Sequence, residues 1–590
     1  MVQIGDSMHQ KTSAPLKKST VVLCLALIAI LAFFLRCLHL LNSDHYYIIS
    51  VDSHFFHWMA ELVQSGNTVD HPFIGHTVPT IWHTGITYPL AYIAKAIGFI
   101  FSMSPVDALT FISKFLPPTL AVISIAVIYL AVSRIYNQRV ALFSAFAWAI
   151  LAPGIFMQGA GYLDRDGLSI LLLMIGAFIF YLSREWHWKI GHLDLGWVAG
   201  GLAVLAIEAL LLLEWIWVGP LLLLTILITF FVVEVLVKFF RHIAPMLMEG
   251  EDLMTLLRQS LVGIATAIKE SNWRPFAMII GLSALMGAIS PGFPYMYRLV
   301  TSIVREALSP AVGGVPVAEM QGLGLGDLIG YGFLTIPLGI GLLIMLANHR
   351  RADLFPLLWF AALFFLGLFA KRVFLYAAPA GCIIAGLGLA FVWHLNEHQL
   401  LRRYIEKSVL RYMRTGSIIV LLLLLVSLSS FWGYVIGSGR MVAANDNWRD
   451  ALTYLRDSTP QEAVVMSWWD YGYWILDLAE RRPVVDNGYY AYDQERLEDV
   501  GLAYCTTEPS EAVQLMQKYG ADYLVFSRLE EDIFGGIAEF GLGEEYEDSD
   551  SIVEKLQDSL YVRALSGDFQ SEQGLGVVYR NDEVVILELQ

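Results

Sequence analysis

Long apolar segments separated by short polar ones occupy the first three quarters of the chain. From Ser19 to Leu41 the sequence is almost free of charge, close to the ~20 residues that a helix needs to cross a membrane. Similar segments follow and, with the first, predict eleven spans: 113–133, 138–158, 167–183, 195–213, 216–237, 275–293, 328–347, 354–370, 373–394 and 416–436. Because the stretch 239–274 has room for two weaker spans, we expect eleven to thirteen transmembrane helices.

Basic residues set the expected orientation. Lys11, Lys17 and Lys18 precede the first span and place the N-terminus in the cytoplasm by the positive-inside rule. A cleaved signal peptide is the alternative, but the apolar stretch is too long and lacks a small-x-small cleavage site. Further basic clusters fall where cytoplasmic loops are expected: 134–139, 184–189, 238–241, 349–351 and 402–414. Counting the apolar run 84–104 as a span would invert these loops, so we expect it to lie at the membrane surface within an external loop, 42–112.

After Arg440 the pattern changes to short alternating elements, which is typical of a mixed α/β domain. We expect helices at 447–457, 473–480 and 511–519, strands at 463–467, 483–485 and 523–526, and a final hairpin turning at Asn581–Asp582. The predicted organisation is a transmembrane domain, 1–437, with external loops 42–112, 159–166 and 294–327, followed by an extracytoplasmic domain, 438–590. An odd number of spans places that last domain outside.

Composition narrows the class of protein. Hydrophobic residues make up 56% of the 590 and charged residues only 16%, which excludes a soluble cytosolic enzyme. The net charge of −16 argues against a nucleic-acid partner. From Arg440 onward there are 31 acidic and 11 basic side chains, so the acidity belongs to the C-terminal part. The four cysteines, three of them in apolar runs, do not form a disulfide framework.

Four carboxylates collect on the predicted outer face: Asp52, Asp164, Asp166 and Glu319. Charged groups at membrane spans are costly, which makes each a functional candidate, although an acid beside a span is most often simply solvated. Oxygen ligands of this kind suit Mg²⁺ or Mn²⁺. Glu208, inside an apolar run, is a rival candidate. The external loop also allows a zinc site built from histidines: His45, His54, His57, His71, His76 and His83.

Two further features point to substrate binding. Lys371 and Arg372 follow a span that exits outward, so they are either membrane anchors or ligands for an anionic group. Trp468-Trp469-Asp470-Tyr471-Gly472 lies between a predicted strand and a helix, where α/β sheets place ligands. The indole N–H groups donate and Asp470 accepts, which suits a small hydroxyl. An aromatic core or interface patch is the alternative.

These five residues match the WWDYG signature of the oligosaccharyltransferase catalytic subunits. Asp52 resembles the first acidic motif of that family, Asp164-Arg165-Asp166 the second, and Val317-Ala318-Glu319 its later external-loop motif. Arg372 resembles the arginine with which bacterial members bind an acidic residue two positions before the acceptor asparagine. The resemblance covers the whole chain in order and implies a polytopic, GT-C-like membrane fold. One departure is Met157, where a bacterial relative has an arginine.

The resemblance implies transfer of a glycan from a polyprenyl-(pyro)phosphate donor to the asparagine of Asn-x-Ser/Thr. It assigns Mn²⁺ or Mg²⁺ to Asp52, to one or both of Asp164 and Asp166, and to Glu319, and it places Asp52 and Glu319 at the acceptor amide. The pentapeptide would hold the Ser/Thr hydroxyl, with Leu529 and Ile533 completing the pocket. Arg372 would pair an acidic side chain of the acceptor.

Two other functions remain open: a different polyprenyl-phosphate-dependent membrane glycosyltransferase and a membrane transporter. The pentapeptide favours the first function over both. The chain contains no Asn-x-Ser/Thr sequon of its own. With the compact C-terminal part and Arg372, this favours a prokaryotic plasma membrane, with the C-terminal domain in the periplasm.

Overall fold

The computed structural model describes most of the chain and groups it into two compact units. The described residues are 16–41, 48–66, 72–73, 76–77, 87–183, 189–190, 193–194, 196–213, 219–249, 253–270, 277, 279–281, 334–348, 350–368, 371–395, 422–428, 431, 444–487, 494–543 and 556–590. The first unit, the helical unit, comprises 1–39, 118–159 and 165–439. The second, the mixed unit, comprises 40–117, 160–164 and 440–590.

Apolar helices build the helical unit. They are α2 (Lys18–Cys37), α6 (Gln138–Ile150), α7 (Ala152–Met157), α8 (Arg165–Ser183), α9 (Gly196–Leu213), α10 (Gly219–Glu249), α11 (Leu253–Glu270), α15 (Thr335–Asn348), α16 (Arg351–Gly367), α17 (Lys371–Phe374) and α18 (Ala378–Leu395), with the 3₁₀ turn η5 (Leu375–Ala377) between the last two. A short hairpin joins β3 (Lys189–Ile190) to β4 (Leu193–Asp194). Within the described residues, five helical segments are long and apolar enough to cross a membrane: Lys18–Leu40, Pro105–Ile135, Asp166–Ser183, Leu222–Pro245 and Leu375–Trp393.

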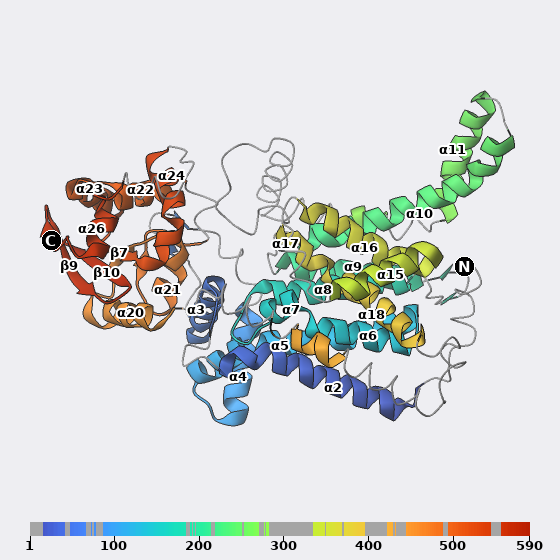
Figure 1. The fold of residues 1–590 in the computed structure, drawn as a ribbon, viewed down its shortest axis with the longest axis horizontal. Coiled ribbons are helices and arrows are strands. Elements are labelled where there is room, and N and C mark those ends of the chain that lie inside the picture. The colour runs from blue at the N-terminus through green and yellow to red at the C-terminus, as the bar shows by residue number, and fades with distance from the viewer. Residues whose placement is uncertain are drawn as a thin grey trace, which may run out of the picture. The chain divides into compact units, whose positions relative to one another are not determined.

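Small residues let these helices pack closely. Helix α18 lies against α6 and α15 (Figure 1). A Cβ atom at Gly386 of α18 would lie 2.2 Å from the Oγ of Ser144 in α6, and one at Gly341 of α15 would lie 1.9 Å from the carbonyl oxygen of Ile384. Only glycine allows such contacts, as is common where helices associate without a hydrophobic driving force between them.

A buried arginine connects α2 to the end of α6. Arg36 is fully buried, and its guanidinium donates hydrogen bonds to the carbonyl oxygens of Ala149 at 3.1 Å and Trp148 at 3.3 Å. The carbonyls of a last helical turn have no partners within their own helix. Arg36 therefore provides hydrogen-bond donors for the carbonyl groups at the end of α6, where no water is needed to do so.

Several predicted spans differ in detail from the structure. The predicted span 138–158 is two helices, because α6 ends at Ile150 and Pro153 lies in the first turn of α7. Residues 238–241, which we expected in a loop, are helical and lie inside α10, which continues to Glu249. Lysine and arginine are good helix formers, so a basic cluster does not by itself end a helix.

The mixed unit combines external-loop helices with a sheet. Its N-terminal part holds α3 (Val51–Ser65), the two-stranded β1 (Pro72–Phe73) and β2 (His76–Thr77), α4 (Thr87–Phe101) and the beginning of α5 (Pro105–Ile135); the 3₁₀ turn η1 (Leu38–Leu41) precedes them. Within the run 84–104, which we did not count as a span, Thr87–Phe101 form α4.

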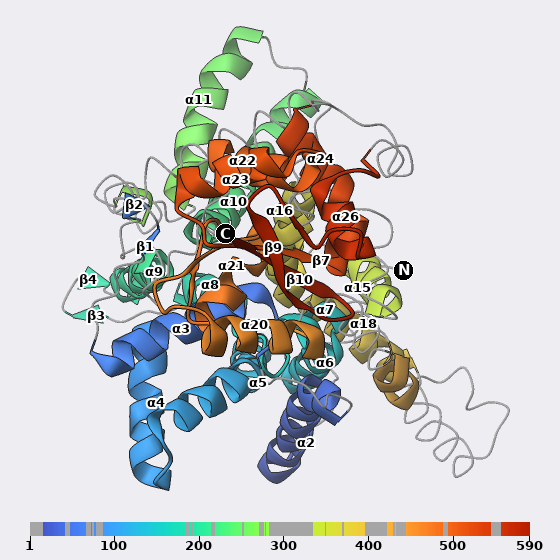
Figure 2. The ribbon, with the colours of Figure 1, turned by 90° about the vertical axis from the view of Figure 1, so that its left-hand side faces the viewer.

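The C-terminal part of this unit is a six-stranded mixed sheet of order β6-β5-β7-β10-β9-β8. Strand β5 is parallel to β6 and β7, and the remaining pairs are antiparallel. The strands are β5 (Val464–Met466), β6 (Arg482–Pro483), β7 (Tyr523–Ser527), β8 (Ser571–Glu572), β9 (Leu575–Arg580) and β10 (Val584–Leu589). Helix α20 (Asp446–Ser458) covers one face (Figure 2). The other face carries α22 (Gln494–Cys505), α23 (Pro509–Tyr519), α24 (Phe534–Leu542) and α26 (Leu560–Ser566).

Tryptophan anchors the core of this domain. Trp448 of α20 is fully buried; its ring stacks on Tyr471 at 4.3 Å between centroids, and its Nε1 donates to the Oγ of Ser527 at 3.0 Å. The predicted helices 447–457 and 511–519, strand 523–526 and the final hairpin are confirmed. The helix predicted over 473–480 is shorter, since α21 covers Gly472–Asp477.

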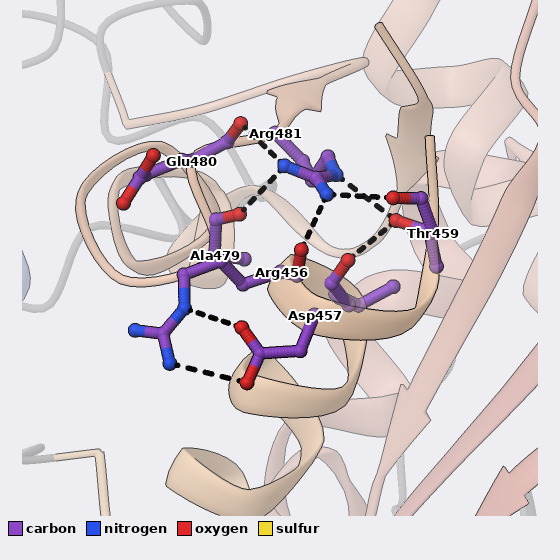
Figure 3. A network of polar contacts seen from close by, with 7 residues as sticks. Arg456, Asp457, Thr459, Ala479, Glu480 and Arg481 are labelled. Atoms are coloured by element: carbon purple, nitrogen blue, oxygen red, sulfur yellow. Dashed lines mark hydrogen bonds and ion pairs between the residues drawn. The ribbon is translucent and has the colours of Figure 1, made fainter. Parts of the chain in front are cut away.

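The end of α20 is closed by Arg481. This buried side chain donates to the carbonyl oxygens of Arg456 at 2.6 Å and Thr459 at 2.7 Å, and to the Oγ1 of Thr459 at 2.9 Å (Figure 3). It also reaches the carbonyl oxygens of Ala479 and Glu480. Arg481 thus donates to carbonyl oxygens at the end of α20 and to carbonyl oxygens just after α21, and it holds these two helix ends together.

Candidate functional site

Asp52 lies at the start of a helix. It occupies the first turn of α3, where the helix dipole favours negative charge. Ser50, the residue directly before α3, has a φ of 77°. Left-handed backbone at a residue other than glycine is uncommon and often occurs at functional sites. Asp52 is therefore held by a strained entry into α3.

The segment that carries Asp164 is joined to the entry of α3. The N–H of Ile49 donates to the carbonyl oxygen of Gly161, and the N–H of Gly161 donates to that of Lys114, each at 2.9 Å. Gly161 has a φ of 83°, which suits glycine. Asp164 is 5% exposed. These backbone bonds bring two of the predicted acidic segments together within the mixed unit.

Asp166 belongs to the helical unit. It lies in the first turn of α8 and is buried, and the hydroxyl of Tyr376 donates to its Oδ1 at 2.8 Å. Tyr376 sits in η5, directly after the short helix α17 that contains Arg372. The segment that contains Arg372 thus also contains Tyr376, whose hydroxyl orients Asp166 of the second acidic motif.

The pentapeptide forms the connection from β5 to α21, as predicted. It comprises the 3₁₀ turn η7 (Trp469–Tyr471) with Trp468 before it and Gly472 after it. Trp468, Tyr471 and Gly472 are buried, whereas Trp469 and Asp470 keep part of their surface exposed. Only these last two have accessible side-chain surface, and the other three are packed into the domain.

A polar network connects this turn to the predicted hydroxyl pocket. The N–H of Trp468 donates to the hydroxyl oxygen of Tyr504 at 2.9 Å, and that hydroxyl lies 2.8 Å from the Oε1 of Glu530. Burial raises the pKa of Glu530 well above its usual range. Glu530 lies in η9 (Arg528–Ile533), with Leu529 and Ile533 each 40% exposed. The hydrogen bond from Tyr504 to Glu530 therefore orders η9, the turn on which Leu529 and Ile533 are exposed.

Carboxylates in the mixed unit act on one another. Burial, and then the negative charge of Asp52, raise the pKa of Asp470 to about 7. A divalent cation among these oxygens would offset this repulsion, and carboxylates are the ligands that Mg²⁺ and Mn²⁺ prefer. Of the four predicted ligands, Asp52 and Asp164 belong to this unit, and their carboxylates are of the kind that these ions take.

Some predicted residues lie outside the described part of the chain. Glu319 is one, and so are the side chain of Arg372 and the histidines His45, His71 and His83. The rival candidate Glu208 is buried in α9. Sequence reasoning missed Asp477, which binds His54 and His57 of α3. The i, i+3 spacing of those histidines was the available signal, and nothing in the sequence connected it to a residue 420 positions later.

Comparison with known proteins gives a consistent result. No family model matches the chain. Dolichyl-phosphooligosaccharide-protein glycotransferase 3 of Archaeoglobus fulgidus is 24% identical over 497 residues, which are 67% of this chain and 56% of that protein. The chain thus spans a little over half the length of this relative.

Two solved structures of oligosaccharyltransferase from the same organism share the fold. The apo form has a TM-score of 0.73 at 18% identity, and the form in complex with an inhibitory peptide and a dolichol-phosphate has 0.71 at 17%. Each alignment covers 96% of this chain and 80% of the other. The predicted fold class, a polytopic helical membrane protein with a C-terminal mixed α/β domain, is confirmed, and so is the family resemblance. The chain is a multi-pass membrane protein.

The last residue of the pentapeptide gives a direct test of the local packing. A Cβ atom at Gly472 would lie 2.5 Å from the carbonyl oxygen of Val485 and 2.6 Å from the Cα of Asp486, both of which are backbone atoms. We expect Gly472→Ala to destabilise the mixed unit by about 3 kcal/mol, since the backbone must shift. Thermal unfolding of the solubilised chain measures the loss.

The matched control is Gly536→Ala in α24, where an added Cβ has open space. This change should be neutral or stabilise by about 0.5–1 kcal/mol. Equal unfolding temperatures for the two variants would contradict the packing described for Gly472.

Proposed function

We propose that this chain, a relative of the oligosaccharyltransferase catalytic subunits, transfers a glycan from a polyprenyl-(pyro)phosphate donor to the asparagine of Asn-x-Ser/Thr. One observation carries the proposal: α21, which begins with the last residue of the pentapeptide, packs on α3, whose first turn carries Asp52. The contact runs through Asp477, which lies 2.5 Å from the Nδ1 of His54 and 3.0 Å from that of His57. An acidic-motif residue and the pentapeptide are therefore held on two helices that touch.

The two halves of this site have complementary tasks. An amide nitrogen is a poor nucleophile because its lone pair is delocalised, so it needs fixed hydrogen-bond acceptors. Asp52, with Glu319, would accept from the acceptor amide N–H. Trp469 and Asp470 would hold the hydroxyl two residues on, with Trp468, Tyr471 and Gly472 supporting the turn. Leu529 and Ile533 would cover the aliphatic part of that side chain. Binding of the acceptor at these two points would orient its amide nitrogen for attack on the sugar of the donor.

The donor side would depend on a divalent ion. We assign Mn²⁺ or Mg²⁺ to Asp52, Asp164, Asp166 and Glu319; when bound, it stabilises negative charge that develops on the leaving (pyro)phosphate. Tyr376 would orient Asp166 for the ion by donating to its Oδ1. Multiple apolar helices would place the reaction at a membrane surface, which we propose to be the outer face of the plasma membrane. The C-terminal domain would lie on that side.

The experiment that tests this function uses the full chain in detergent with lipid-linked donor, a labelled sequon peptide and Mn²⁺. Asp52→Asn and Glu319→Gln should each lower glycopeptide formation by about 10²-fold or more, because each removes charge aimed at the reacting groups. Glu462→Gln, at an exposed acid of the same unit, should retain full activity. Unchanged turnover in both site variants would remove the metal assignment.

Tyr376→Phe tests the orientation of Asp166. Losing the hydroxyl should weaken apparent Mn²⁺ affinity by about tenfold while the chain remains folded, since groups that orient ligands contribute on this scale. Activity measured across a Mn²⁺ titration gives the affinity. Tyr454→Phe in the C-terminal domain is the control. A loss of kcat that saturating Mn²⁺ does not restore would contradict a metal-orienting role for Tyr376.

Arg372→Ala tests acceptor selection. If the guanidinium pairs an acidic side chain two positions before the asparagine, the variant should lose any preference for Asp or Glu there, with little change for neutral peptides. KM for matched acidic and neutral peptides measures this, with Lys371→Ala as the neighbouring control. A preference that survives in Arg372→Ala would show that Arg372 is only a membrane anchor.

A further inference from the structure

A second group of ligand-type side chains lies deeper along α3. His54, His57 and Glu61 recur every three or four residues and therefore share one face of this helix. Asp477, at the end of α21, packs against that face. Its Oδ2 lies 2.5 Å from the Nδ1 of His54, and its Oδ1 lies 3.0 Å from the Nδ1 of His57.

Three of these four side chains are buried, and Glu61 is half-buried. The side chains of Asp477 and His54 are 2% and 0% exposed, and that of His57 is 7% exposed. Burial opposes ionisation of Asp477, yet the His57 charge and hydrogen bonds from both imidazoles hold the pKa of Asp477 at about 2. Burial and the charges of Asp477 and Glu480 raise the pKa of Glu61, although His57 acts in the opposite direction. The carboxyl group of Glu61 thus lies beside His57 and Asp477, and His57 offsets its negative charge less than it offsets that of Asp477.

The geometry is that of a cation site. One ligand atom each from His57, Glu61 and Asp477 lie within 4.8 Å of one another. Among the described residues, the Nε2 of His57 is buried without a hydrogen-bond partner, and such atoms are rare in folded proteins. Imidazole with carboxylate favours Zn²⁺, whereas Mg²⁺ prefers oxygen ligands alone. The donors therefore differ in kind from the all-carboxylate set around Asp52.

We propose that His57, Glu61 and Asp477, with His54 beside them, form a second metal site of the Zn²⁺ type that joins α3 to α21. In binding the ion, His57 exchanges a proton for the metal, since imidazole ligates only in its neutral form. Asp52 lies in the first turn of α3, and α21 begins with the last residue of the pentapeptide. The ion would hold these two segments in register from the side away from the proposed substrate.

Metal content and unfolding test the proposal without reference to transfer activity. The full chain in detergent is stripped with a chelator, incubated with Zn²⁺ in excess Mg²⁺, desalted and analysed for zinc. Wild type should retain one more zinc per chain than the double variant His57→Asn/Glu61→Gln. Added Zn²⁺ should raise the unfolding temperature of wild type and leave that of the double variant unchanged.

Two single variants separate this site from others. Glu61→Gln keeps the histidine–Asp477 contacts and so should fold, yet it should bind Zn²⁺ at least tenfold more weakly. Asp52→Asn should retain the zinc even where it loses glycopeptide formation, which distinguishes failure of this proposal from failure of the proposed function. Equal zinc content in wild type and Glu61→Gln, or loss of the zinc in Asp52→Asn, would overturn the proposal.

Discussion

The packing of α21 on α3 is the constraint on which the account of this molecule depends. Asp477 of α21 lies 2.5 Å from the Nδ1 of His54 and 3.0 Å from that of His57, and all three side chains are buried. The first turn of α3 carries Asp52, and α21 begins with the last residue of the pentapeptide. This contact therefore holds an acidic-motif residue and the pentapeptide in one part of the mixed unit. The polar network from Trp468 through Tyr504 to Glu530 orders the same turn.

Helix α3 is the element that unites these charges. Its first turn carries Asp52, and its buried face carries the histidines that bind Asp477. Because α21 follows the pentapeptide without a linker, the contact with Asp477 also sets where Asp470 lies relative to α3. Breaking a buried pair of this kind by removing one partner typically costs 3–5 kcal/mol. Helix α3 therefore carries both the structural contact with Asp477 and the residue proposed for the chemistry, Asp52.

Much of this arrangement was predictable from the sequence, and the reasons are local. Long apolar runs and the change of pattern after Arg440 predicted the fold class, because membrane burial and sheet alternation leave direct periodic signals. The turn of the pentapeptide followed from its place between a strand and a helix. The break at Leu151 and the unbroken course of α10 through 238–241 were not predicted, since proline placement and helix propensity act against the simple apolar pattern.

The contacts between distant residues were beyond sequence reasoning. Tyr376 and Asp166 are 210 positions apart, and Asp477 and His57 are 420 apart. Only the packing of helices on one another brings such side chains together, and no local spacing encodes it. Motif resemblance named Asp166 and Arg372 individually, but the hydroxyl that connects the Arg372 segment to Asp166 came from the structure.

Mapping of modified proteins tests the central claim most directly. The chain is expressed in a host without protein glycosylation that carries one defined lipid-linked oligosaccharide, and glycopeptides are sequenced by mass spectrometry. The account predicts the intact glycan on asparagine two residues before Ser or Thr, and nowhere else. Modification of another side chain, or transfer of the glycan to a lipid with no modified protein, would contradict it.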